Sequence, residues 1–418
     1  MRVCVVGSGG REHALAHVLG RTAEVVVTPG NAAIPGSVPA PPEEVEADLF
    51  IVGPEAPLVD GLADRLRAAG RAVFGPGADG ARLEGSKAWM KDLLAAAAVP
   101  TARYGSFADE RSALDFLRTL PGPWVVKTDG LAAGKGVLVT GRLDEAEDDV
   151  RAKLAGESFG DAGRTVVIEE GLTGPELSVL AICDGSRAVP LAPAQDFKRV
   201  GDDDTGPNTG GMGAYSPVPF AGADVVGTVM DGFVEPTLAE LRRRGIDYRG
   251  VLYAGLMLTP DGPRLLEYNV RFGDPEAQVV LPRLTTDLAE LLAAAAAGDL
   301  RRAPGAAFGD DACVAVVLAS AGSPGEPRRG DVIDGLDVAT AQGATVFAAG
   351  VARDGDGRLV TAGGRVLAIT GTGATIAAAR RHAYAGVGCV SWPGMHHRSD
   401  IALRPGGKPG RGPNGPAP

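Results

Sequence analysis

Short apolar runs alternate with helical patterns in the first part of the chain. The runs "RVCVVG", "EVVVT", "DLFIVG" and "AVFG" predict strands, and "REHALAHVL" and "LVDGLADRLRAAG" predict the helices between them. Strands that alternate with helices are typical of a parallel sheet with helices on its faces. We therefore expect residues 1–98 to form an open α/β domain.

The rest of the chain predicts two further regions of mixed strands and helices. Residues 99–307 carry the strand-like runs "WVVKTDG", "TVVIEE" and "LSVLAICDG" beside the helical "LDEAEDDVRAKLAG". Residues 308–403 carry "CVAVVLAS", "GATVFAAG" and "GRVLAITGTG" before a helix in "TIAAARRHAYAGV", which predicts a small α+β domain. The last residues, 404–418, are rich in proline and glycine, and we expect a disordered tail.

Charge and composition narrow the classes of function. The formal net charge of -11 argues against general nucleic-acid binding, which needs a basic surface. No apolar run reaches the roughly 20 residues of a bilayer span, so we expect no membrane partner. The four cysteines have no paired spacing, which favours a reduced, cytoplasmic setting over zinc or disulfide sites. Small-molecule chemistry is the interpretation that these observations favour.

Lysine is rare in this chain, which holds seven lysines among 41 basic residues. Five of them lie in glycine-rich or strand-like surroundings, namely Lys87, Lys91, Lys127, Lys135 and Lys198. A compact ammonium that meets phosphate oxygens is one physical reason to retain lysine where arginine is otherwise used. The alternative is chance.

The loop "GSGGREHA" follows the first predicted strand and opens a predicted helix. Glu12 stands where the G-x-G-x-x-G pattern needs its third glycine, which disfavours a nicotinamide dehydrogenase. A plain strand-to-helix turn is one remaining interpretation. A site for the phosphate or ribose of another ligand is the other, since helix starts present free N–H groups to anions.

The stretch "WVVKTDGLAAGKGVLV" places Lys127 on a strand and Lys135 in a loop of small residues that could close over a polyphosphate. The later stretch "TVVIEEGLTGPELSV" gathers Glu169, Glu170 and Glu176 beside a strand. These acids could form only a solvated rim. The other hypothesis is nucleotide recognition, with backbone groups facing adenine and a carboxylate holding the ribose hydroxyls.

A further polar set lies in "GVLYAGLMLTPDGPRLLEYNVRFGDPE", two apolar runs joined by a turn sequence that predicts a β-hairpin. Side chains alternate along a strand, so Glu267, Asn269 and Arg271 share one face while Tyr268 and Val270 share the other. Magnesium prefers oxygen ligands and usually takes one or two carboxylates beside phosphate and water. Arg271 can bind a carboxylate or phosphate with two N–H groups. A hairpin with a polar outer face is the alternative.

The order of Lys127, Lys135, "IEEGLTGPE" and "LLEYN" resembles the ATP-grasp superfamily of carboxylate-amine ligases. Longer motifs resemble the phosphoribosylamine-glycine ligase family from Met1 to about Arg404, among them "GGREHALA", "PGN", "IVGPEAPLVDGL", "LEGSKAWMKD", "FGDAG", "QDFKRVGDDDTGPNTGGMGAYSP" and "NVRFGDPEAQ". The resemblance implies a two-subdomain ATP-grasp core in 99–307, with a lid at about 122–187.

The resemblance also implies the reaction. ATP, glycine and 5-phosphoribosylamine would give glycinamide ribonucleotide, ADP and phosphate through a glycyl phosphate, in the second step of purine biosynthesis. ATP would be a co-substrate with Mg²⁺ or Mn²⁺. We expect a monomer with small-molecule substrates only.

Site residues follow from the resemblance, motif by motif. It implies contacts with ATP at Lys87, Lys127, Lys135, Glu169, Glu170, Leu172 and Glu176. It implies metal ligands at Glu267 and Asn269, and catalytic roles for Arg271, Lys135 and Gly211. It implies substrate contacts at Gly9, Gly10, Arg11, Glu12, Gly30, Asn31, Glu55, Asp196, Lys198, Asn208, Thr209, Gly210, Gly211 and Arg271.

The stretch "TGPNTGGMGAYSP", 205–217, resembles the substrate loop of this family. Its glycines would let backbone N–H groups line an anion at close range, and its prolines would limit the entropy of ordering the loop. A flexible linker is the alternative, which the flanking Asp196, Lys198 and Arg199 disfavour.

Two other functions stay open, a different ATP-grasp ligase and a non-catalytic nucleotide-binding protein. The sequence also departs from the family's pattern in one place. Only "AAIPGSVPAPPEEVEADLF" separates "PGN" from "IVGPE", where the family usually has a further strand and helix. The first hairpin strand, "VLYAGLMLT", has no acid, so the protein ligand of a second metal ion is open.

Overall fold

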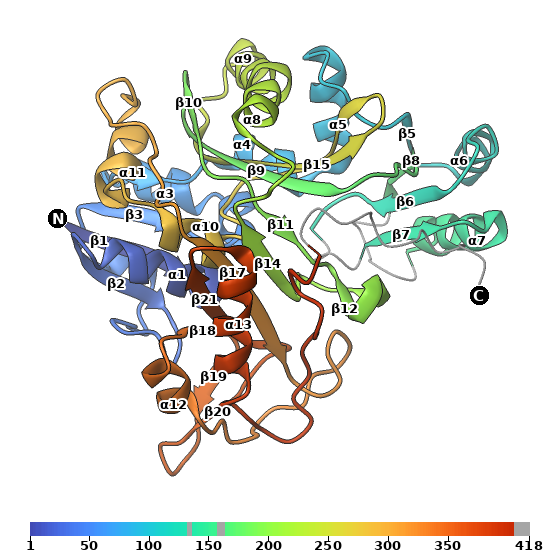
Figure 1. Cartoon of the computed structure of the whole chain (residues 1–418). Coiled ribbons are helices and arrows are strands. Elements are labelled where there is room, and N and C mark those ends of the chain that lie inside the picture. Colours follow the sequence, from blue (N-terminus) through green and yellow to red (C-terminus); the bar gives the residue numbers. More distant parts are fainter. Residues whose placement is uncertain (132–135, 157–163, 405–418) are drawn as a thin grey trace.

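The computed structural model describes residues 1–131, 136–156 and 164–404 (Figure 1). The described residues form a parallel N-terminal sheet, three larger antiparallel sheets and two two-stranded antiparallel sheets. The predicted combination of α/β and α+β parts is confirmed. Nearly all of the predicted tail, 404–418, lies outside the described residues.

The N-terminal sheet has the strand order β2-β1-β3-β4, and all its strands run parallel. Its strands are β1 (Arg2–Gly7), β2 (Glu24–Pro29), β3 (Leu49–Val52) and β4 (Val73–Phe74). The helices of this part are α1 (Gly10–Leu19), η1 (Pro42–Glu44), α2 (Glu55–Val59), α3 (Leu62–Ala68), α4 (Ala78–Gly85) and α5 (Lys87–Ala96). The four predicted strands are therefore confirmed.

Two connections in this part are shaped by local sequence. The short stretch between β2 and β3 forms only the 3₁₀ turn η1, so no α-helix crosses the sheet there. The prediction of a single helix in "LVDGLADRLRAAG" is wrong, because the helix is interrupted at Gly61, between α2 and α3. Gly61 has a φ of +77°, a left-handed conformation that glycine adopts without steric cost.

A second sheet, of order β5-β8-β6-β7, forms a unit to the right in Figure 1. It comprises β5 (Tyr104–Phe107), β6 (Trp124–Thr128), β7 (Val137–Thr140) and β8 (Val166–Glu170), with helices α6 (Glu110–Leu117) and α7 (Leu143–Leu154). Leu117, Val126 and Ile168 belong to its own hydrophobic core, which is separate from the main one. The unit spans 104–170, whereas the expected lid spans 122–187.

The third sheet, of order β10-β9-β15-β16, contains the predicted hairpin. Its strands are β9 (Glu176–Asp184), β10 (Ala188–Pro190), β15 (Arg249–Thr259) and β16 (Gly262–Asn269). The helical segments of this part are α8 (Ala223–Val229), η4 (Met230–Val234), α9 (Glu235–Arg243), α10 (Ala277–Val280), η5 (Leu281–Arg283) and α11 (Leu288–Ala297). Thr259 pairs with Gly262 across the two-residue turn, as the turn sequence predicts.

The alanine-rich helix α11 shows how local sequence sets the ends of an element. The Asp287 carboxylate accepts hydrogen bonds from the backbone N–H groups of Ala289 and Glu290, which caps the start of the helix. Gly298, with a φ of +78°, ends it. Within the described ranges, no helix is both long enough and apolar enough to cross a bilayer.

The fourth sheet crosses the expected boundary between residues 307 and 308. Its order is β11-β14-β17-β21-β18, and β11 (Gln195–Asp196) and β14 (Gly213–Ser216) come from the expected ATP-grasp region. The other elements of this part are β17 (Ala312–Ala319), α12 (Leu336–Ala341), β18 (Thr345–Ala348), β19 (Val351–Arg353), β20 (Leu359–Thr361), β21 (Arg365–Gly373) and α13 (Ile376–Val387). The end of the glycine-rich stretch is thus a strand of the C-terminal sheet.

Helix α1 packs against β18 and so joins the first and last parts of the chain. The His13 Nδ1 atom accepts a hydrogen bond from the backbone N–H of Ala348, at 2.8 Å. The rings of His13 and His17 both pack edge-on against the buried ring of Phe347. Burial, with a smaller contribution from His17, lowers the pKa of His13 from 6.5 to about 4.

We expect the free energy of unfolding to fall as the pH falls from 6.5 towards 4. The folded state holds His13 neutral, so the unfolded chain binds the extra proton first. This contribution is complete above pH 6.5 and is lost on acidification. His13→Gln, whose amide oxygen can still accept from Ala348, should show a weaker pH dependence than the wild type, with His17 accounting for the remainder.

Urea unfolding of both proteins at pH 5 and pH 7.5 measures this difference, with His382→Gln on α13 as the control. An unchanged pH dependence in His13→Gln would contradict the assignment.

Candidate active site

Arg271, just beyond the end of β16, joins the hairpin to two helices of the N-terminal part. Its Nη2 atom donates to Glu84 Oε1 and to Asn269 Oδ1, both at 3.0 Å. Its Nε atom donates to Glu55 Oε2 at 3.3 Å. Arg271 and Asn269 therefore lie on the same side of the strand, as alternation predicts, while Tyr268 is buried against Thr237 on the other side.

Burial and ion pairing act in opposite directions on the pKa values of this cluster. Burial raises the pKa of Glu84, and Arg271 only partly opposes it. Burial would also raise the pKa of Glu55, but Arg271 and Arg11 outweigh it, so the pKa of Glu55 is lowered. Burial alone would lower the pKa of Arg271, but Glu84 and Glu55 outweigh it and raise this pKa. Arg271 thus stays charged.

A buried carboxylate holds two of the predicted lysines in place. Glu169 lies 2.7 Å from Lys127 Nζ and 2.9 Å from Lys91 Nζ, and its side chain is only 2% exposed. Burial lowers the pKa of Lys91 to about 8, with Glu169 opposing the change. Because both oxygens of Glu169 face ammonium groups, its carboxylate holds Lys91 and Lys127 in place.

The other predicted nucleotide contacts lie around this buried group. Lys87 Nζ donates to the carbonyl of Gly130 at 2.9 Å, and the charges of Glu267 and Lys127 act on its pKa, which burial lowers. Leu172, in the loop after β8, has no backbone hydrogen bond within the described part of the chain. Lys135 lies outside the described residues.

Glu267 lies on β16 and is half-buried. Within the described residues, its carboxylate forms no hydrogen bond or ion pair, and no three His, Cys, Asp or Glu side chains gather as metal ligands. Its neighbour on the same face is the Asn269 amide, whose oxygen accepts from Arg271. This donor set, one carboxylate and one amide oxygen, matches a magnesium ion that completes its coordination with phosphate and water.

The charged residues that flank the glycine-rich stretch form one chain of ion pairs. Lys198 Nζ lies 2.6 Å from Glu176 Oε2 and 2.9 Å from Asp196 Oδ1. Burial raises the pKa of Asp196, and Lys198 opposes this rise. Thr209 donates to the carbonyl of Lys198 through both its N–H and its hydroxyl, and Asn208 lies on β13 (Thr205–Asn208), paired with β12 (Arg199–Gly201).

Gly210 and Gly211 pack closely against other segments. A Cβ atom on Gly210 would lie 2.8 Å from the guanidinium carbon of Arg365, and one on Gly211 would lie 2.5 Å from Pro275. Gly211 also has a φ of +107°. Arg365 donates to the carbonyl of Gly210 and forms an ion pair with Asp274. A side chain at either glycine would displace these contacts.

The N-terminal glycine loop opens onto a cavity of about 380 Å³. Its lining residues are Val6, Gly7, Ser8, Gly9, Arg11, Glu12, Pro29, Pro54, Pro57 and Asp274. The Glu12 carboxylate accepts from the backbone N–H of Gly9 at 2.7 Å and from Arg11 Nε at 2.6 Å. Gly10 lies against Gln278, which leaves no room for a Cβ atom there.

The "PGN" loop is held from several sides. Gly30, with a φ of +63°, donates to the carbonyl of Gly7, and its close neighbour is Ser37. The Asn31 amide nitrogen donates to the carbonyls of Ser8 and Ala349, each at 2.9 Å, and its oxygen accepts from Ala33. The side chain of Asn31 therefore braces the loop.

Three residues of this site escape a reading of the sequence. Glu84 lies in an ordinary helix pattern, Asp274 follows Arg271 in "RFGDPE" but off the strand, and Arg365 opens a strand far along the chain. Asp274 and Glu84 had a local signal, since they lie in the motifs "NVRFGDPEAQ" and "LEGSKAWMKD". Arg365 had none, and tertiary packing brings it into the site.

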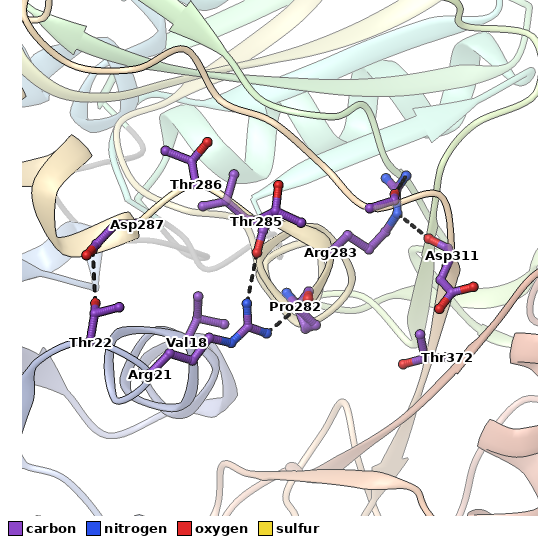
Figure 2. Close-up of a pocket in the computed structure, with 12 residues that line it drawn as sticks. Val18, Arg21, Thr22, Pro282, Arg283, Thr285, Thr286, Asp287, Asp311 and Thr372 are labelled. Atoms are coloured by element: carbon purple, nitrogen blue, oxygen red, sulfur yellow. Dashed lines mark hydrogen bonds between the residues drawn. The ribbon is translucent and has the colours of Figure 1, made fainter.

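A larger cavity, of about 430 Å³, lies where α1, η5 and the C-terminal sheet meet (Figure 2). Arg21 donates across it to the carbonyls of Pro282 and Leu284, and Thr22 contacts Asp287. None of the predicted site residues with described positions lines this cavity. Predicted site residues therefore line the smaller of these two cavities and not the larger one.

Family comparisons cover these same parts of the chain. Residues 1–84 match the family described as Phosphoribosylglycinamide synthetase, N domain. Residues 85–277 match its ATP-grasp (A) domain, and residues 313–404 match its C domain. The three matches follow one another in the order of the family.

Individual relatives point to the same family as the domain matches. The chain is 47% identical to a phosphoribosylamine–glycine ligase of Xanthomonas campestris and 48% identical to one of Streptomyces coelicolor, over 97% of this chain and 98% and 100% of those proteins. A solved phosphoribosylamine–glycine ligase from Thermotoga maritima superimposes with a TM-score of 0.87 at 35% identity, covering 96% of this chain and all of that one.

More distant solved structures share the fold alone. The biotin carboxylase domain of a Hydrogenobacter thermophilus 2-oxoglutarate carboxylase, solved with MgADP and bicarbonate, gives a TM-score of 0.73 at 15% identity over 98% of this chain and 96% of that one. The whole-length relatives and the ordered domain matches settle the family. The chain belongs to the phosphoribosylamine–glycine ligase family, whose members carry an ATP-grasp domain.

Proposed function

We propose that three groups of residues together carry out the family's reaction in this protein. They are the two glycine loops (the N-terminal loop at Gly9 and Gly10, and the glycine-rich stretch at Gly210 and Gly211), the lysines around Glu169, and the Arg271 cluster. That reaction is the ATP-dependent joining of glycine to 5-phosphoribosylamine, the second step of purine biosynthesis. The observation that carries the proposal is the meeting of the two glycine loops at Asp274. Asp274 lines the cavity of the first loop, and through Arg365 it is joined to Gly210 of the second.

The nucleotide side of the proposal uses the groups between the second and third sheets. We assign Lys87 and Lys127 to the α and β phosphates. Their ammonium groups donate to the backbone carbonyls of Gly130 and Leu266, which holds both of them in place. Leu172, whose backbone groups have no hydrogen bond within the described residues, is assigned to adenine, and the half-exposed carboxylate of Glu176 is assigned to ribose. Glu170 is assigned beside Leu172, and Lys135, outside the described residues, is assigned to ATP.

The metal side uses Glu267 and Asn269, with Mg²⁺ or Mn²⁺ as the ion. The Glu267 carboxylate, which has no hydrogen bond or ion pair among the described residues, and the Asn269 oxygen would hold it beside Lys87 and Lys127. A bound ion supplies positive charge to phosphoryl oxygens as their charge develops. Asn269 is oriented for this role by Arg271, which keeps its oxygen on the same face as Glu267.

The chemistry needs positioning and charge more than a protein nucleophile. A glycine carboxylate is a poor electrophile, so we propose that it first accepts the γ-phosphoryl group of ATP and that the sugar amine then attacks the glycyl phosphate, releasing phosphate. Arg271 has four of its five N–H donors in contact with protein, so it presents a rigid positive charge to the acyl phosphate. The backbone at Gly211 is assigned to the developing oxyanion, and its N–H, which donates to Thr209 Oγ1 at 2.9 Å, would exchange that partner for the oxyanion.

The cavity of about 380 Å³ is assigned to the phosphoribosylamine. Gly9 and Gly10 open helix α1, and Arg11, Glu12 and Glu55 supply charge along its edge. Backbone N–H groups at a helix start favour an anion such as a phosphate. In this arrangement, Gly30 and Asn31 support the cavity by donating to the carbonyls of Gly7 and Ser8, which line it.

We further propose that the protein works as a monomer in the cytoplasm. The four cysteines are free thiols, and three of them are buried, as a reducing compartment allows.

The first test is ADP release with ATP and Mg²⁺, adding glycine and phosphoribosylamine separately and together. We expect release to require both, because the acyl phosphate forms productively only when the amine acceptor and the carboxylate are bound. Alanine and bicarbonate replace glycine as controls. Release that ignores glycine but answers to another carboxylate would favour a different ATP-grasp ligase, and no release under any combination would favour a non-catalytic protein.

The second test is Glu267→Ala. We expect kcat to fall by about 100-fold or more, since charge stabilisation of several kcal/mol is lost and about 1.4 kcal/mol corresponds to a factor of ten. Glu290→Ala, at an exposed position of α11, is the matched control. Calorimetry of Mn²⁺ and ADP binding and a urea unfolding curve accompany the kinetics. Wild-type turnover in Glu267→Ala would remove Glu267 from the metal site.

A further inference from the structure

Arg365 is the first residue of β21, in the C-terminal sheet, yet its guanidinium lies among residues of the ATP-grasp part. Its Nη1 atom donates to the carbonyl of Gly210 at 2.6 Å and to the carbonyl of Asp274 at 2.8 Å. Its Nη2 atom donates to the Asp274 carboxylate at 3.0 Å. One side chain therefore joins the glycine-rich stretch to the loop that follows Arg271.

The guanidinium fits a slot that glycine creates. A Cβ atom on Gly210 would lie within 2.8 to 3.2 Å of three guanidinium atoms, so any other residue there would push Arg365 out. Gln278 Nε2 binds the second oxygen of the Asp274 carboxylate at 2.7 Å, which fixes the carboxylate for Arg365. Burial would raise the pKa of Asp274, but Arg365 and Arg11 outweigh it and lower this pKa, so the pair stays ionised.

The backbone of Arg365 lies next to a segment, 348–350, that contacts the N-terminal part of the chain. Its carbonyl accepts from Gly350 N at 3.0 Å. The preceding residues, Ala348 and Ala349, bind His13 and the Asn31 amide of the N-terminal part. The C-terminal part thus contacts helix α1 and the "PGN" loop through backbone groups at 348–349, and the glycine-rich stretch through the Arg365 side chain.

We propose that Arg365 is a positioning residue that holds Gly210 and Gly211 in register with Asp274 and the sugar cavity. The assignment rests on the proposed function for the meaning of that register, because the two loops would carry the acyl phosphate and the amine that attacks it. Arg365 acts through the backbone of Gly210 and through Asp274. The C-terminal sheet then has a defined part in the reaction.

The chemical consequence concerns water. When the amine attacks glycyl phosphate, the new C–N bond forms, the C–O bond to phosphate breaks, and the amine gives up one proton. If the loops are out of register, a water molecule attacks the same carbonyl, forming a C–O bond and returning glycine, phosphate and one proton. ATP is then consumed without product, so ADP exceeds glycinamide ribonucleotide.

The test compares Arg365→Ala, Arg365→Lys and Arg358→Ala. Arg358 is an exposed arginine paired with Asp354, away from both loops, and serves as the matched control. We expect Arg365→Ala to lower kcat by about 10- to 100-fold, since small misplacements cost this much. We also expect its ratio of ADP to glycinamide ribonucleotide to rise above that of the wild type. Arg365→Lys should fall between, because an ammonium can reach one acceptor but lacks the planar fork.

Hydrogen exchange at the amides of 209–211 gives a readout that does not depend on turnover. We expect faster exchange there in Arg365→Ala, with the exchange of the β5–β8 unit unchanged. If Arg365→Ala has no cooperative unfolding transition, Arg365→Lys alone decides. Wild-type exchange, kcat and coupling in the folded variant would overturn the proposal. A wild-type protein that makes no glycinamide ribonucleotide would overturn the proposed function, whereas exchange would still decide whether Arg365 holds the loop.

Discussion

The guanidinium of Arg271 is the contact on which the arrangement of the site depends. It lies between the carboxylates of Glu55 and Glu84, on helices of the N-terminal part, and the amide of Asn269 at the end of β16. Removing one partner of a buried charge cluster leaves an uncompensated charge, which typically costs about 3–5 kcal/mol. The same contact fixes where the proposed metal-binding face of β16 stands relative to the sugar cavity. Stability and geometry of the site are therefore coupled.

Burial of charge follows the same rule at Glu169. Its two ammonium partners come from α5 and β6, so the separate β5–β8 unit is anchored to the rest of the chain beside Lys127, which we assign to an ATP phosphate. The hydrophobic core of that unit is otherwise distinct from the main core. A unit with its own core that is tied to its neighbour by a few polar groups can change its orientation without unfolding. This arrangement suits an enzyme that must admit and enclose a nucleotide.

The glycines of the site allow neighbouring segments to pack closely, and this matters more here than backbone flexibility. Gly210 and Gly211 lie against Arg365 and Pro275, and Gly10 lies against Gln278, all at distances that a Cβ atom would not permit. The glycine-rich stretch ends in β14, which is hydrogen-bonded into the C-terminal sheet. The stretch is therefore anchored at this end and braced at its centre. The linker alternative does not describe it.

The sequence determined the local elements and the family. Short apolar runs predicted β1 to β4, and two apolar runs joined by a turn sequence predicted the β15–β16 hairpin, because apolar runs and turn residues are local properties. Motif order predicted the ATP-grasp family, which the comparisons confirm. It also placed Asn269 and Arg271 on one face, since that needs only the period of a strand.

Tertiary structure decided which distant groups meet. The partners of Arg271, the burial of Glu169 between two lysines and the reach of Arg365 into the site depend on packing between segments up to 216 residues apart. The same holds for β14, which joins a sheet with strands that lie about a hundred residues further along. Periodicity along a chain carries no information about such pairings, because any compatible surface could satisfy them. Only the folded chain selects the surface that excludes water and satisfies the buried charges together.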